Sequence, residues 1–141
     1  MRLMFLLPLL LLLSCETDVL EPKPVGEAPF SLRHGETAVV RPSGALIRFD
    51  ELLDDSRCPL DLECFWEGKA DLRMWLRTPA ADEIILQLSI YGYVTSADTA
   101  RQLSVDTLGY RITLLQLDPY SQRASCSAVG EYVALLKVSS L

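Results

Sequence analysis

Hydrophobic and polar residues alternate with a period of two from Phe30 onward, and turn-forming residues separate the alternating runs. The clearest run is Lys69–Arg77, in which the aliphatic residues all share one parity. Because successive side chains of a strand point to opposite faces, such a run predicts a strand with one buried face. The same reasoning predicts eight strands: Phe30–Leu32, Thr37–Val40, Ala45–Phe49, Lys69–Arg77, Glu83–Tyr91, Gln102–Asp106, Tyr110–Leu117 and Glu131–Ser139.

The segments between and within these runs refine the prediction. Thr78–Asp82 is predicted to be a hairpin loop, and Glu51–Asp55 to form one short helical turn. Tyr110–Leu117 is apolar on both faces, which predicts a central strand that is well covered. Seven to eight short strands at roughly ten-residue spacing predict an all-β domain, either an antiparallel β-sandwich or a small barrel. We expect the sandwich.

An apolar run of eleven residues, Leu3–Leu13, precedes this domain and follows the single positive charge of Arg2. As a helix it would span about 16 Å, roughly half of a bilayer core, which favours a secretory signal over a transmembrane helix. The run ends in the letters LLSC at residues 12–15, which resemble the lipobox of bacterial lipoproteins. The resemblance implies cleavage before Cys15 and a lipid on its sulfur, whose acyl chains would anchor the protein to a membrane. An ordinary secreted protein with an incidental cysteine is the alternative.

The next segment, Glu16–Pro29, has three prolines, a glycine, many charges and no periodicity, which predicts a flexible tether. The predicted organisation is therefore a cleaved signal of residues 1–14, a tether of residues 15–29 that starts at the lipidated cysteine, and an all-β domain of residues 30–141. We expect this domain in the bacterial cell envelope, in the periplasm or outside the cell. Which membrane holds the anchor stays open.

The formal net charge is −6, and removal of the signal with Arg2 takes it to about −7. Nucleic-acid binding and polybasic membrane patches both need clustered lysine and arginine, so the charge argues against both. An acidic domain is compatible with a basic partner.

Four cysteines occur in the chain, and the lipid would occupy Cys15. A chain with a secretory signal matures in an oxidising compartment, where thiols pair. Cys58 and Cys64 are close in sequence on a turn-rich loop, and we expect a disulfide between them. Cys126 is then left over in the polar loop Ser121–Gly130, as a free thiol, an intermolecular bridge or a member of an alternative pairing.

The cysteine-bounded loop carries the pattern D-S-R-C-P, four residues, then C-x-W-x-G, followed by an alternating strand. This pattern resembles a family of small bacterial envelope lipoproteins, and the resemblance extends over most of the domain. It implies a β-sandwich and a disulfide, but no particular activity. The matching residues are Asp55, Ser56, Arg57, Cys58, Pro59, Cys64, Trp66 and Gly68.

The same stretch is a candidate for metal binding or catalysis because it is rich in carboxylates: Asp50, Glu51, Asp54, Asp55, Asp61, Glu63 and Glu67. Dense oxygen ligands suit Ca²⁺, but the spacing is not that of a known calcium loop, so calcium is only a weak alternative to a solvated acidic loop. Soft metals would need free cysteines beside His34. His34 is the only histidine, and no serine-nucleophile elbow is present. We therefore expect neither an enzyme nor a cofactor.

A candidate binding face follows from strand parity, because tryptophan, tyrosine and arginine are frequent interface anchors. Its members lie on one parity of the fourth and fifth predicted strands: Arg73, Trp75, Arg77, Ile85 and Tyr91. We expect instead that another sheet or a loop covers this face and makes Trp75 a core residue. Trp66, beside the disulfide, is likewise expected to be a packing residue.

The sequence thus predicts a lipid-anchored domain that acts by binding, as an interaction or structural module with an envelope protein or glycan as its partner. The alternative function is an inhibitor-type lipoprotein that blocks a basic hydrolase such as a lysozyme or a protease. For that function the Cys58–Cys64 loop is the candidate contact element. The oligomeric state stays open.

Overall fold

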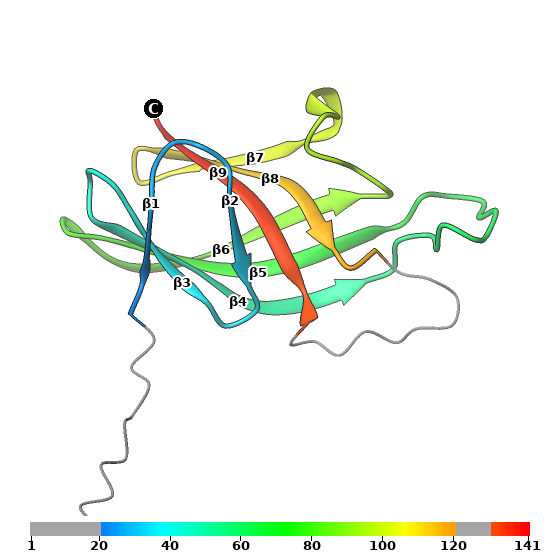
Figure 1. The fold of residues 1–141 in the computed structure, drawn as a ribbon, viewed down its shortest axis with the longest axis horizontal. Helices are drawn as coiled ribbons and strands as arrows, with labels where there is room; N and C mark the ends of the chain where they lie inside the picture. The colour runs from blue at the N-terminus through cyan, green and yellow to red at the C-terminus, as the bar shows by residue number, and fades with distance from the viewer. Residues whose placement is uncertain (1–20, 121–130) are drawn as a thin grey trace, which may run out of the picture.

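Nine strands form two sheets that pack face to face in the computed structural model, which describes residues 21–120 and 131–141 (Figure 1). One sheet has the order β1-β3-β4-β5-β6 and the other β2-β9-β8-β7. The strands are β1 Lys23–Val25, β2 Phe30–Arg33, β3 Thr37–Val40, β4 Ala45–Asp55, β5 Lys69–Thr78, β6 Ala81–Tyr91, β7 Leu103–Thr107, β8 Tyr110–Asp118 and β9 Val133–Ser140. Apart from the parallel pair β1–β3, all neighbouring strands are antiparallel. The predicted β-sandwich is confirmed, with nine strands in place of seven or eight.

The core lies between the two sheets and is built from alternate residues, as the period-two pattern predicts. In β5 the inward residues are Ala70, Leu72, Met74 and Leu76, and all four are fully buried. Across the core, Leu32, Leu114 and Leu136 of the second sheet are equally inaccessible. Burial of large aliphatic side chains on both inner faces supplies the main driving force for the fold.

The predicted helical turn at Glu51–Asp55 is wrong, because these residues extend β4. The register of β4 against β5 shifts twice, between Phe49 and Glu51 and again between Leu52 and Asp54. Each shift leaves an extra residue in β4, as in a β-bulge, and interrupts the alternation of inward and outward side chains. The period-two signal fails at this point although the strand continues.

A further register shift explains why β8 is apolar on both parities. It falls between Leu114 and Gln116, so that Leu114 and Leu117 both point into the core although they differ in parity. β8 is an interior strand of its sheet, between β9 and β7, as predicted. Its outer face is not covered as we expected, since Arg111 is exposed and Thr113 half-exposed. The hairpin loop at Thr78–Asp82 is also tighter than predicted, because Thr78 pairs with Ala81.

The expected boundary at residue 30 also differs from the structure, since β1 lies within the predicted tether. β1 pairs with β3 at the edge of its sheet, and Val25 is buried in the core. An edge position tolerates Pro24, because the missing amide proton faces away from any partner strand. Three residues are too few to show a period, so the alternation could not reveal this strand.

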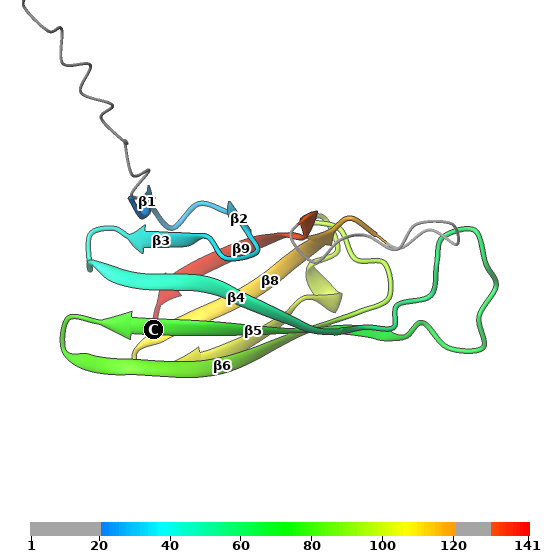
Figure 2. The ribbon, with the colours of Figure 1, turned by 90° about the horizontal axis from the view of Figure 1, so that it is seen from below.

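The two ends of the sandwich differ in character. The short turns β3–β4 and β5–β6 lie at one end, whereas the long β4–β5 connection projects beyond the strands at the other (Figures 1 and 2). The chain enters near the first end, because Lys23 pairs with Ala38, which in turn pairs with Ile47. The residues of β5 that face Ile47 and Asp55 are Leu76 and Ala70, six positions apart, so about 20 Å of sheet separates Ile47 from the end of β4. The projecting connection and the entry point of the chain are therefore well separated along the sheet.

Candidate functional site: a clamped aromatic loop

The projecting β4–β5 connection, residues 56–68, is closed by a disulfide. Cys58 and Cys64 are bonded, with their Cα atoms 5.9 Å apart, which confirms the predicted pair. Closure of so short a loop contributes about 2 kcal/mol in the chain-entropy model. Below the disulfide the strand ladder continues, because the amide of Ser56 donates to Lys69 O (2.8 Å) and that of Cys58 to Glu67 O (2.9 Å). The loop is thus held at its base by the backbone and at its middle by a covalent bond.

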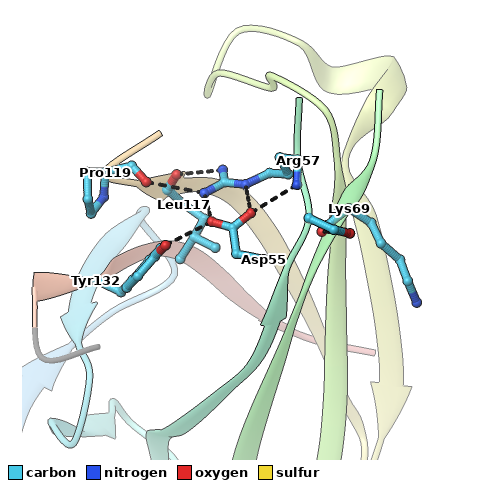
Figure 3. Close-up of polar contacts among 7 residues, drawn as sticks. Asp55, Arg57, Lys69, Leu117, Pro119 and Tyr132 are labelled. Carbon is cyan, nitrogen blue, oxygen red and sulfur yellow. Dashed lines mark hydrogen bonds and ion pairs between the residues drawn. The ribbon is translucent and has the colours of Figure 1, made fainter. Parts of the chain in front are cut away.

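Arg57 fixes the base of the loop to the opposite sheet. Its side chain is 1% exposed and donates to both oxygens of Asp55, at 2.8 and 2.7 Å (Figure 3). It also donates to two main-chain carbonyls at the end of β8, Leu117 O at 2.9 Å and Pro119 O at 3.2 Å. The ring of Tyr120 lies 4.6 Å from the guanidinium carbon. One buried side chain therefore joins the ends of β4 and β8.

Asp55 completes this buried network. Its carboxylate accepts hydrogen bonds from Arg57 and, at 3.0 Å, from the hydroxyl of Tyr132. Burial by itself raises the pKa of the Asp55 carboxyl, but the hydrogen bonds and positive charge of Arg57 outweigh burial and hold that pKa below its usual value. Burial and the hydrogen bond to Asp55 raise the pKa of Tyr132 to about 12, so the hydroxyl keeps its proton. The network is neutral overall and internally satisfied.

A pH dependence of stability follows from the lowered pKa of Asp55. The carboxylate stabilises the fold above the unfolded value of 3.8, and this contribution is lost as the pH falls through the lower pKa of the folded state. We expect Asp55→Asn to lower the melting temperature near neutral pH and to lower it progressively less in strong acid. Thermal melts of both proteins across this range would show the narrowing gap. A gap that stays constant with pH would contradict the assignment.

The projecting loop presents large apolar side chains to solvent. Phe65 is 96% exposed and Trp66 74% exposed, and their rings meet edge-on at 5.5 Å. Leu60 and Leu62 are exposed on the same loop. The expectation that Trp66 is a packing residue is wrong, because the loop projects past the strands and leaves Trp66 mostly exposed to solvent. Clustered exposed hydrophobic groups of this kind commonly mark interaction sites.

Two further segments surround the base of the loop with tyrosines. Arg101 links the segment after β6 to the loop, since it pairs with Glu67 and also donates to the carbonyls of Tyr91 and Tyr93, each at 3.1 Å. Tyr93 in turn meets Tyr120, at the end of β8, edge-on at 5.0 Å. We call the surface formed by Phe65, Trp66, Tyr91, Tyr93 and Tyr120 the aromatic end. Sequence reasoning missed Phe65, Tyr93 and Tyr120; a signal was their position outside the alternating runs, next to turn residues.

The other candidate face lies on the outer side of the β4–β5–β6 sheet. Trp75 is directly opposite Ile85, and Ile85 is 70% exposed. The expected cover is therefore wrong, because the second sheet packs on the opposite side and Trp75 is only half-buried. Arg73 pairs with Asp50 at 2.8 Å and with Glu51 at 2.5 Å. The remaining two members are exposed: Arg77 and Tyr91. Six residues separate Ile85 from Tyr91, about 20 Å along β6, so the structure divides this set between two places.

The carboxylates around the loop serve mainly as partners of arginine side chains. Among the described residues, no group of three histidine, cysteine, aspartate or glutamate side chains is placed to hold a metal ion. His34 lies in the turn before β3 and meets Phe49 edge-on at 5.6 Å. Cys15 and Cys126 lie outside the described residues.

Two wider observations complete the description. Within the described part of the chain, no helix has the length and apolarity needed to cross a membrane. Comparison of the chain with models of protein families, with curated proteins and with solved structures gives no match.

Proposed function

We propose that this protein is a lipid-anchored, non-catalytic binding module of the bacterial envelope, and that the aromatic end is its contact surface. The observation that carries the proposal is the pair Phe65 and Trp66, which are 96% and 74% exposed on a loop that is clamped at its base and its middle. Leaving two large aromatic rings in water is unfavourable unless a partner buries them. Aromatic residues are also the side chains on which binding energy concentrates in interfaces.

The rigidity of the loop supports a role in binding. A contact loop that is already ordered loses little conformational entropy when it docks, and this increases affinity. The disulfide between Cys58 and Cys64 and the buried Arg57 supply that order from two sides. Neither group faces solvent in a way that suggests chemistry on a substrate: Arg57 is buried, and the two sulfurs are bonded to each other.

The position of the loop agrees with the anchoring that the lipobox-like sequence predicts. The chain enters the domain at β1, about 20 Å along the sheet from the base of the loop. An anchor at Cys15 would then attach on the side of β1 and leave the aromatic end directed elsewhere. The partner would thus be met away from the attachment point.

The proposal predicts that the double replacement Phe65→Ser with Trp66→Ser abolishes binding of the partner without loss of the fold. The measurement is crosslinking of the lipidated protein in the native envelope, with circular dichroism and thermal melts to verify folding. Because both side chains are solvent-exposed, we expect at most a small change in melting temperature. The recovered partner should disappear from the crosslinked products.

Ile85→Ser is the matched control, because it removes an exposed apolar side chain of the other candidate face. We expect it to retain the partner. Trp75→Ala tests the same face by a larger change. Our proposal would be refuted if Trp75→Ala or Ile85→Ser lost the partner while the Phe65 and Trp66 double variant retained it. That result would assign the contact surface to the outer side of the β4–β5–β6 sheet.

A further inference from the structure

We infer that the partner is a basic protein, whose contact site presents arginine or lysine side chains around an apolar pocket. This inference rests on the proposed function, since it names the chemistry of what the aromatic end binds. It depends on three further observations: where the negative charge lies, how the rings are oriented and how the protein itself binds an arginine.

The negative charge of the sequence is concentrated in the second half of β4 and in the loop that follows it. The eighteen residues from Asp50 to Glu67 contain seven carboxylates and one arginine, a formal charge of −6. That equals the charge of the whole chain, so the other residues are formally neutral together. The sole arginine of the stretch, Arg57, is buried. Three of the seven carboxylates belong to the projecting loop itself: Asp61, Glu63 and Glu67. An excess of negative charge at this end of the domain steers oppositely charged proteins toward it.

Part of this charge is balanced within the domain. Arg73 pairs with Asp50 and Glu51 near the middle of the sheet, and Arg101 pairs with Glu67 at the loop. Between the two cysteines the loop holds Asp61 and Glu63 and no basic residue. Carboxylates thus stand within a few residues of the exposed rings of Phe65 and Trp66.

The orientation of the rings favours a protein over a flat ligand. Phe65 and Trp66 meet at an interplanar angle of 88°, and so do Tyr93 and Tyr120. Perpendicular rings do not form a level platform on which a sugar ring or a base could lie. Rings at right angles form a protruding group that fits into a pocket of a protein partner. Their faces remain open to guanidinium groups, which stack on tryptophan and tyrosine.

The protein contains an internal example of this chemistry. Arg57 lies between the carboxylate of Asp55 and the ring of Tyr120, with bidentate hydrogen bonds on one side and the aromatic face on the other. The exposed aromatic end offers the same two kinds of group, carboxylates and aromatic faces. An arginine from another protein would find the same complementary pair of contacts there.

A lipid bilayer also buries tryptophan and phenylalanine side chains, but the negative charge of the loop argues against a bilayer as the partner. Insertion of Phe65 and Trp66 would bring Glu63 and Glu67 to the headgroup layer, where anionic lipids repel carboxylates. The loop is also far along the sheet from β1, where the chain enters. We therefore assign the aromatic end to a protein partner and treat membrane and glycan binding as outcomes that the experiment distinguishes.

The test uses the lipidated full chain with a photo-crosslinking residue at Leu60, which is exposed on the loop and leaves both rings intact. Proteins captured in the native envelope are identified, and the crosslinked site is mapped on the partner. Affinity for the purified partner is then measured at about 0.1 M and about 1 M salt, between which the Debye length falls from roughly 10 Å to roughly 3 Å. We expect a mapped site with arginine or lysine around an apolar pocket and an affinity roughly tenfold lower in high salt.

Glu63→Gln and Glu83→Gln form the matched pair of variants, since both carboxylates are exposed but Glu83 lies on β6. We expect Glu63→Gln to weaken binding about threefold and Glu83→Gln to leave it unchanged. Binding that is insensitive to salt and to Glu63→Gln, yet lost in the Phe65 and Trp66 variant, would overturn the basic-partner inference and leave the proposed function standing. Capture of no protein, or loop-dependent binding to anionic vesicles or to cell-wall glycan instead, would also overturn it.

Discussion

Replacement of Gly68 by alanine is expected to destabilise the domain by about 3 kcal/mol or more, the largest effect of any single methyl group in the loop. Gly68 has a φ of +67°, a conformation that costs an alanine about 1–2 kcal/mol. A Cβ at this position would lie 2.0 Å from Ser56 O and 2.9 Å from the Cα of Arg57. Both atoms belong to the facing backbone, which cannot move without breaking the ladder that closes the loop.

Gly35→Ala is the control for the conformational term alone. Its φ of +81° is similar, but nothing lies within 4 Å of an added Cβ. We expect this variant to lose only about 1–2 kcal/mol. Urea unfolding of both variants gives their free energies of unfolding, and unchanged m-values show that the loss is one of stability. Equal losses would show that the close approach of the two backbones at Gly68 is relieved at no cost.

Removal of the Arg57 side chain is expected to cost about 3–5 kcal/mol, because Arg57→Ala leaves a buried carboxylate without its counter-charge. The carbonyls of Leu117 and Pro119 lose their donor at the same time. Lysine should not restore stability, since a single ammonium cannot reproduce the fork that reaches Asp55 and both carbonyls. Urea unfolding reports the loss, and hydrogen exchange should show faster exchange of the amides of Ser56 and Cys58 at the base of the loop.

Arg111→Ala provides the comparison for this prediction. Arg111 makes a bidentate pair with Asp106 through bonds of 2.8 and 2.7 Å, close to those that Arg57 makes with Asp55. Both partners are exposed, however, and exposed ion pairs contribute little. We expect no measurable change in stability. Similar losses of stability for Arg57→Ala and Arg111→Ala would contradict the view that burial makes the Arg57 network strong.

The strands could be predicted from the sequence wherever one face is buried and the register is regular. Ala70 to Leu76 in β5 show this, because each inward residue is two positions from the next and all are inaccessible. The prediction failed at the register shifts of β4 and β8, where an extra residue reverses the parity. A bulge is defined by pairing with a neighbouring strand, and a single sequence does not contain that pairing.

The candidate site could be predicted only in part, for a related reason. The disulfide was predictable from the spacing of Cys58 and Cys64 together with the oxidising compartment that a secretory signal would imply. Exposure of Trp66 depends on how far its loop projects beyond the sheets, which the local sequence does not encode. The partners of Arg57 lie in β8, and Tyr93 meets Tyr120 from another segment. Contacts between such distant residues require the fold.

The reach of Arg57 also sets the order in which the domain can mature during synthesis. The two carbonyls to which Arg57 donates lie 60 and 62 residues after it in the chain. Tyr132, which donates to Asp55, lies 77 residues after Asp55. A nascent chain that ends after β6 already contains both loop cysteines and the aromatic pair Phe65 and Trp66. It lacks the carbonyls to which Arg57 donates, and it lacks Tyr132. The loop with Phe65 and Trp66 is encoded in the first half of the protein, but its base is fixed only when the segments around Leu117 and Tyr132 have been made. Quality control that senses exposed hydrophobic residues would therefore see an incomplete chain as different from a finished one.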